Sequence, residues 1–154
     1  MSSASLQPSV IDDYLHRELA KGRIAGPFSS PQLPHLHISR FGVITKKHQP
    51  GKWRLILNLS SPDGQSVNDG IRKDPFTVQY MKVYDTIDGI MSLGRGTLLA
   101  KFDADSPYCI TPVHPNDLDL LGMQWQGNYL VDITLPFGLP SVPYVFSSVA
   151  GLVE

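Results

Sequence analysis

Apolar side chains recur every three or four positions near the start of the chain, at Val10, Ile11, Tyr14, Leu15 and Leu19. This spacing is typical of one face of a helix. Ser9 is a suitable N-cap residue and Gly22 a suitable terminator. The pattern therefore predicts a helix over Val10–Lys21.

Two pairs of β-rich runs predict hairpins. Phe41–Thr45 and Trp53–Leu59 are separated by two lysines and the turn-like sequence His-Gln-Pro-Gly. Leu120–Trp125 and Tyr129–Thr134 flank the sequence Gln-Gly-Asn. Runs of this length on either side of a turn-forming sequence are typical of paired antiparallel strands.

The remaining segments complete an α+β pattern. Three prolines predict that Gly26–Pro34 is an extended connector. Helical spacing predicts helices over Tyr84–Leu93, followed by Gly94, and over Ser141–Leu152, with Pro143 in the first turn. Thr97–Asp103 is strongly apolar and predicts a buried strand that ends in a carboxylate. This order of elements lacks the regular alternation of a βαβ fold.

Composition narrows the class of protein. The chain has 154 residues, 42% of them hydrophobic, which suits a single globular domain. Its 13 Gly and 13 Pro favour many turns over a helical bundle, and its one cysteine excludes an internal disulfide. No apolar run is long enough to span a membrane, and the first residues lack the pattern of a signal peptide. We therefore expect no membrane partner and an intracellular location, cytoplasmic or nuclear.

The net charge of -1 conceals two oppositely charged halves. Residues 1–82 contain 11 Lys and Arg against 6 Asp and Glu, and residues 83–154 contain 2 against 8. One interpretation is a phosphate-binding surface beside a cation-binding one. The other is two solvated faces that attract each other.

Two carboxylates follow the predicted strand Thr97–Asp103. Asp103 ends it and Asp105 lies two residues later, so an extended chain places both on one face. Two such groups repel each other unless a cation neutralises them, and Mg²⁺ prefers oxygen ligands. In the alternative interpretation, Asp103 caps the next helix and Asp105 faces solvent.

Basic residues gather at the tip of the first predicted hairpin, at Lys46, Lys47, Lys52 and Arg54, with Trp53 among them. A guanidinium binds phosphate through two hydrogen bonds and lysines add positive charge, so this tip could hold a triphosphate or a nucleic-acid backbone. The alternative is a set of lysines that keeps the strand edges soluble.

A succession of blocks along the chain resembles the fingers and palm of a retroelement reverse transcriptase, most closely the type in DIRS-like tyrosine-recombinase retrotransposons. The blocks are GPF, GVITKK, GKWRLILNLSSPDGQSVNDGI, LLAKFDADSPY, PVHPND, LLGMQWQGNYLVD and LPFGLPSVP. They run from about Arg17 to Phe146 in the order of that family. The resemblance implies a right-hand polymerase with an antiparallel sheet packed with helices, flexible residues 1–8, and a fingers and palm fragment over residues 9–154.

The resemblance also implies roles for single residues. Asp103 matches the first catalytic aspartate and, with the carbonyl of Ala104, would bind two Mg²⁺ ions. Lys47 and Arg54 match the residues that hold the triphosphate. Further nucleotide-binding positions are Ala104, Tyr108, Phe137 and Gly138. Tyr108 matches the aromatic residue that excludes a 2′-hydroxyl, although Tyr108 and Phe137 could instead be core residues.

The implied reaction adds deoxynucleotides to a primer 3′-hydroxyl on an RNA or DNA template by two-metal phosphoryl transfer. The chain departs from the family at Pro140, where arginine is usual, and at Asp105–Cys109. The third palm motif, an adjacent pair of aspartates, does not occur after Asp103. We therefore expect the missing palm, thumb and RNase H regions in a parent polyprotein, and an isolated fragment that is inactive and marginally stable. The alternative is a non-catalytic, nucleic-acid-binding remnant of a retrotransposon polymerase.

Overall fold

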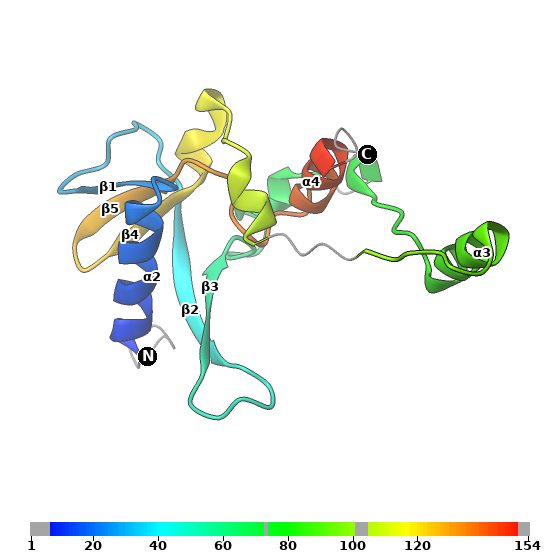
Figure 1. Cartoon of the computed structure of the whole chain (residues 1–154). Coiled ribbons are helices and arrows are strands. Elements are labelled where there is room, and N and C mark those ends of the chain that lie inside the picture. Colours follow the sequence, from blue (N-terminus) through cyan, green and yellow to red (C-terminus); the bar gives the residue numbers. More distant parts are fainter. Residues whose placement is uncertain (1–6, 73, 101–104, 151–154) are drawn as a thin grey trace.

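The computed structural model describes residues 7–72, 74–100 and 105–150, and it is an α+β structure. Figure 1 shows a strand-rich body with helix α2 (Pro8–Ala20) on one side, and helix α3 (Val83–Leu93) standing away from that body. Among the described residues, no helix has the length and apolar character needed to cross a membrane.

The first helix begins earlier than its pattern predicts. Pro8 is its first residue, Gln7 occupies the N-cap, and no side chain caps the end, so the expected capping by Ser9 is wrong. Proline suits this position because the first helical N–H groups have no partner within the helix. Lys21 and Gly22 (φ 65°) then turn the chain into the sheet.

Five strands form one sheet in the order β1-β5-β4-β2-β3. Their bounds are β1 Ile24–Phe28, β2 Ile38–Thr45, β3 Trp53–Asn58, β4 Gly122–Trp125 and β5 Asn128–Asp132. Both predicted hairpins are confirmed, as β2–β3 and β4–β5. The expectation of a wholly antiparallel sheet is wrong, because β2 and β4 are parallel. These two strands are joined by a long segment, so no tight turn forces them to run in opposite directions.

Strand β1 replaces the first part of the predicted connector Gly26–Pro34, so that prediction is wrong for Gly26–Phe28. Pro27 lies where the register with β5 shifts, and β1 is an edge strand, which tolerates a residue without an N–H group. Gly26 (φ 127°) is required because a Cβ there would lie 2.9 Å from the carbonyl oxygen of Tyr129.

Two apolar clusters hold the body together. The first lies between α2 and the sheet and contains Ile11, Leu15, Ile24, Phe41, Val43, Met123 and Leu130. The second contains Leu59, Val67, Val113, Leu121, Leu139 and Val142. A hydrogen bond of 2.7 Å from Trp125 Nε1 to Asp12 Oδ1 also joins α2 to the β4–β5 hairpin.

The arm that carries α3 is exposed. The predicted helix is confirmed and ends at Gly94, but none of its residues is buried. The predicted buried strand Thr97–Asp103 is wrong over residues 97–100, which form no strand, and Leu98 and Leu99 are 94% and 70% exposed. A strand needs a pairing neighbour, and an apolar run alone does not supply one. The rest of that segment lies outside the described residues.

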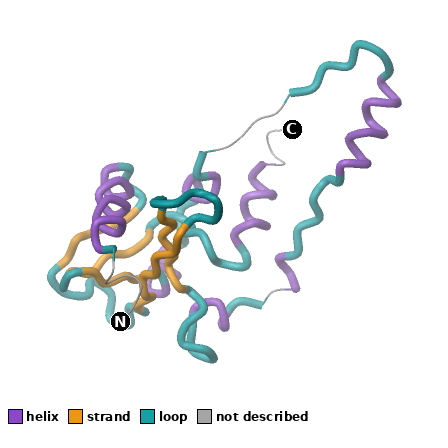
Figure 2. Tube along the Cα trace, turned by 90° about the horizontal axis from the view of Figure 1, so that it is seen from below, coloured by secondary structure: helices purple, strands orange, loops and turns teal. Residues whose placement is uncertain are grey.

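Short helices form much of the chain after β3. Four 3-10 helices are present in the described ranges, namely η1 (Val67–Gly70), η2 (Asp74–Phe76), η3 (Pro107–Ile110) and η4 (Pro115–Leu120). The last predicted helix is confirmed as α4 (Val142–Ala150), with Pro143 in its first turn. Figure 2 shows the strands gathered in one part of the molecule, with helices joined by loops extending away from it.

Candidate functional site

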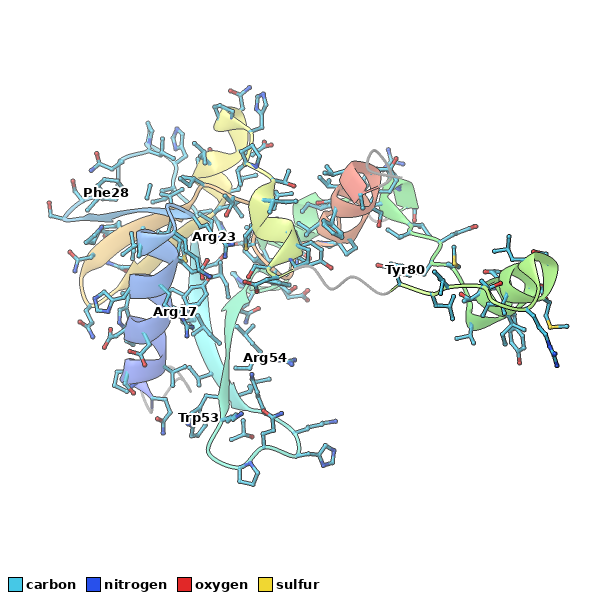
Figure 3. All side chains as sticks on the ribbon, in the orientation of Figure 1. Arg17, Arg23, Phe28, Trp53, Arg54 and Tyr80 are labelled. Atoms are coloured by element: carbon cyan, nitrogen blue, oxygen red, sulfur yellow. The ribbon has the colours of Figure 1, made fainter. Side chains whose placement is uncertain are left out.

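Strand β3 presents two different faces. Trp53, Leu55 and Leu57 are partly buried and pack against the cluster beneath α2. Arg54, Ile56 and Asn58 alternate with them and are exposed. Figure 3 shows Trp53 and Arg54 pointing to opposite sides of the hairpin. This alternation follows from the two-residue period of a strand and leaves the Arg54 side open.

The open face of β3 is one wall of a cavity of about 630 Å³. The hairpin lines it with Ile44, Arg54, Leu55, Ile56 and Leu57. The loop before α4 lines it with Phe137 and Gly138. Ile44 pairs with Arg54 in the hairpin register. The cavity, called here the β3 cavity, therefore combines a guanidinium with apolar side chains and exposed loop backbone.

The loop at Gly138 is held by an unusual backbone conformation and by a hydrogen bond to its carbonyl group. Gly138 has φ 108°, which other residues rarely adopt. Asn68 Nδ2 donates hydrogen bonds to the Gly138 carbonyl oxygen at 3.0 Å and to Ser60 Oγ at 2.7 Å. Sequence reasoning missed this role of Asn68, because only the folded chain brings it to the loop.

An aromatic pair stands beside the β3 cavity. The ring centroids of Tyr108 and Phe137 are 4.8 Å apart, and those of Tyr108 and Phe146 are 5.8 Å apart. Tyr108 also packs against the second apolar cluster. Phe137 is 57% exposed, so its alternative interpretation as a core residue is wrong. Tyr108 thus connects the core to an aromatic ring that is open to solvent.

The basic hairpin tip forms a second hollow of about 430 Å³, lined by Ile44, Thr45, Lys46, Lys47, Gln49 and Arg54. The turn is closed by hydrogen bonds from Lys46 N to Lys52 O at 2.9 Å and from Gln49 N to Lys46 O at 3.3 Å. Lys47 and Arg54 are exposed, and no acidic side chain of the described ranges forms an ion pair with either. Arg54 lines both hollows, so the tip and the β3 cavity share one cation.

The predicted catalytic and metal-binding residues Asp103 and Ala104 lie outside the described residues. Asp105 is exposed, and its Oδ1 accepts a hydrogen bond of 3.1 Å from Ser106 Oγ. Within the described part of the chain, no three His, Cys, Asp or Glu side chains lie together as a metal site. The pairing of Asp103 with Asp105 about a cation therefore stays a prediction.

Comparisons with known proteins identify the fold. No family model matches the chain, and no curated protein matches its sequence. Two crystal structures of prototype foamy virus protease-reverse transcriptase resemble it. A selenomethionine-labelled CSH mutant gives a TM-score of 0.65 at 20% identity over 99% of this chain, and the native protein gives 0.55 at 23% over 96%.

The chain spans less than a fifth of those two proteins, namely 18% and 17% of their lengths. At this level of identity the likeness shows the fold alone. The described chain therefore has a reverse-transcriptase-like fold that corresponds to part of those two proteins.

Proposed function

We propose that this chain is the fingers and part of the palm of an RNA-directed DNA polymerase, and that the β3 cavity receives the incoming deoxynucleotide. The observation that carries the proposal is that Arg54 and the Phe137–Gly138 loop, far apart in sequence, line one cavity beside the Tyr108 ring. The fold likeness to reverse transcriptase supports it.

The triphosphate would bind where the β3 cavity meets the hollow at the hairpin tip, because Arg54 lines both and Lys47 lines the tip hollow. Both side chains are exposed and form no ion pair with a described carboxylate, so their charges are available to an anion. A guanidinium can donate two parallel hydrogen bonds to phosphate oxygens, while an ammonium adds a point charge. These cations would stabilise the negative charge that develops on the transferred phosphoryl group.

The sugar and base would lie toward the loop. Phe137 offers an exposed aromatic face, and Gly138 exposes backbone that no side chain covers. Tyr108 contacts Phe137 in a tilted arrangement and Phe146 in an edge-to-face arrangement. A ring held in this way can exclude a 2′-hydroxyl by shape, and this supports the assignment of Tyr108 as the sugar-selecting residue.

Asp103, with the carbonyl of Ala104, would hold Mg²⁺ in the complete polymerase. When bound, Mg²⁺ neutralises phosphate charge and activates the primer hydroxyl. Among the described residues, no cluster of acidic side chains is present that could supply further ligands beside Asp103 and Ala104. The 154-residue polypeptide has no adjacent pair of aspartates after Asp103, so we expect it to extend no primer by itself.

The finer assignment, to a DIRS-like retrotransposon, rests on the ordered sequence blocks quoted above. It predicts that a complete gene encodes the aspartate pair, thumb and RNase H regions. The template and primer, as RNA or DNA, would be its macromolecular partners.

Binding of a fluorescent deoxynucleoside triphosphate, followed by anisotropy, tests the proposal. The Arg54→Ala variant should weaken binding about tenfold or more, as expected when a charged hydrogen bond is lost. Arg95→Ala is the matched control, because Arg95 is also exposed but lies beyond α3. Equal binding by both variants would refute the nucleotide site.

A second candidate function is that of a nucleic-acid-binding remnant without catalysis, favoured by the exposed basic tip at Lys46, Lys47 and Arg54. In that case RNA or DNA would bind in a salt-dependent manner, and Lys47→Ala with Arg54→Ala would weaken binding. Asp103→Asn would leave binding unchanged, and deoxynucleoside triphosphates would not compete.

A further inference from the structure

A group of polar side chains lies beneath the C-terminal half of α2. Asp132 follows Leu130 by two residues on β5, so both face the same side of the sheet. Leu130 packs against Ile11 and Leu15 of α2. Asp132 is therefore directed under the same helix, where it is only 4% exposed and its Oδ2 has no hydrogen-bond partner.

Tyr14 and Glu18 of α2 and Cys109 of η3 interact electrostatically with Asp132. Arg23, from the turn before β1, acts on Tyr14 and Cys109. Glu18 already pairs with Arg23 at 3.3 Å and with Lys21 at 3.9 Å. The nearby cations are thus engaged by Glu18, and Asp132 forms no ion pair of its own among the described residues.

Burial and the nearby Glu18 carboxylate favour the protonated form of Asp132. Burial raises the pKa of Asp132 to about 8, and the neighbouring Glu18 carboxylate adds to this effect. Burial is also the main cause that raises the pKa of Cys109, to which Glu18 and Asp132 contribute. An ionised Asp132 would therefore repel Glu18 across the contact between α2 and β5.

The backbone connects Asp132 to the turn that carries Tyr108. Val113 N donates to Ile133 O at 3.0 Å, and Leu135 N donates to Thr111 O at 2.9 Å. Pro112 and Thr134 form a bridge between these two hydrogen bonds. The residues that follow η3 are thus attached to those that follow Asp132, and these bonds give a displacement at Asp132 a route to η3.

We infer that Asp132 acts as a proton-dependent latch: α2 and η3 stay packed on the sheet while it is protonated, and both loosen when it ionises and repels Glu18. The latch is a property of the folded chain, and it does not depend on the proposed nucleotide site.

Hydrogen exchange of the full 154-residue chain between pH 7 and pH 9 tests the latch. The exchange rate of each amide is divided by the rate in an unstructured peptide at the same pH, which removes the intrinsic effect of pH on exchange. Across this interval the ionised fraction of a group with pKa about 8 rises about tenfold, from about 0.09 to about 0.91. Corrected exchange in residues 15–20 and 107–113 should rise by a similar factor.

Two variants make this test specific. Asp132→Asn should abolish the rise, whereas Asp88→Asn, on the exposed face of α3, should behave as the wild type. No rise in the wild type, or the same rise in Asp132→Asn, would overturn the latch. If Asp132→Asn fails to fold, Glu18→Gln serves instead. It removes the repelling charge and should move the midpoint of the rise to lower pH, and an unchanged midpoint would overturn the inference.

Discussion

The rings of Tyr108 and Phe137 lie 4.8 Å apart with an angle of 58° between their planes. Tyr108 belongs to η3 and Phe137 to the loop before α4, so this contact joins two segments that are separate in the sequence. One ring reaches the second apolar cluster and the other is open to solvent beside Arg54. The pair thus links the stability of the body to the shape of the β3 cavity.

Truncation of Phe137 should affect binding more than folding. Phe137→Ala removes an exposed ring, so we expect a change of less than about 1 kcal/mol in the free energy of unfolding. Affinity for a deoxynucleoside triphosphate should fall about fivefold or more, because stacking on an aromatic face is lost. Anisotropy and urea titration measure the two effects, and Tyr144→Ala, another exposed aromatic position, is the control. Unchanged affinity in Phe137→Ala would contradict the role of this ring.

Gly138 should not tolerate a side chain. Its φ of 108° is unfavourable for alanine, and Gly138→Ala should cost roughly 1–2 kcal/mol in the free energy of unfolding. Gly89→Ala is the matched control, because Gly89 lies inside α3 with open space around it. Alanine should raise the helicity of that segment by virtue of its higher helix propensity. Circular dichroism during urea unfolding tests both, and a stabilised Gly138→Ala variant would show that the loop adopts another conformation.

Asp12 should contribute to the attachment of α2. Its Oδ1 accepts hydrogen bonds from Trp125 Nε1 at 2.7 Å and Gln126 Nε2 at 3.2 Å. Asp12→Ala should lower the free energy of unfolding by about 1–3 kcal/mol, since the partly buried indole N–H loses a charged partner. Asp13→Ala, at the next and exposed position, should have little effect. Equal effects in the two variants would show that the bond contributes nothing to stability.

Asp132 should make the protein less stable as pH rises. The pKa of Asp132 is about 8 in the folded chain, above the ordinary value of 3.8, so the folded state binds a proton that the unfolded state has released. The free energy of unfolding should therefore fall between about pH 4 and pH 8, by up to about 1.4 kcal/mol per pH unit, and level off above pH 8. Urea titrations across this range measure the slope. Asp132→Asn should reduce it, and an equal slope in that variant would assign the effect to other groups.

Local signals made the hairpins and helices predictable. The β2–β3 and β4–β5 pairs are each encoded by two β-rich runs and the turn between them, and Gly94 marks the end of α3. Strand β1 was missed because Gly26 and Pro27 disfavour a strand locally, whereas pairing with β5 stabilises one. The parallel contact of β2 with β4 depends on tertiary structure and has no local sequence signal.

The sequence predicts single residues of the candidate site but not how the fold brings them together. Alternation along β3 predicts that Arg54 and Trp53 face opposite sides. Nothing local indicates that Asn68 would hold the Gly138 loop, or that Asp132 would be buried beneath α2. Both depend on segments brought together by folding, and Asp132 is the last residue of β5, a strand whose final three residues are all buried.

Photo-crosslinking of the full chain with an azido-substituted deoxyadenosine triphosphate tests the central claim most directly. Mass spectrometry then locates the label on peptides. We predict labelling within residues 53–58 and 135–140, reduced by excess unmodified nucleotide and by Arg54→Ala. Labelling confined to other segments, or labelling that unmodified nucleotide does not reduce, would contradict the account.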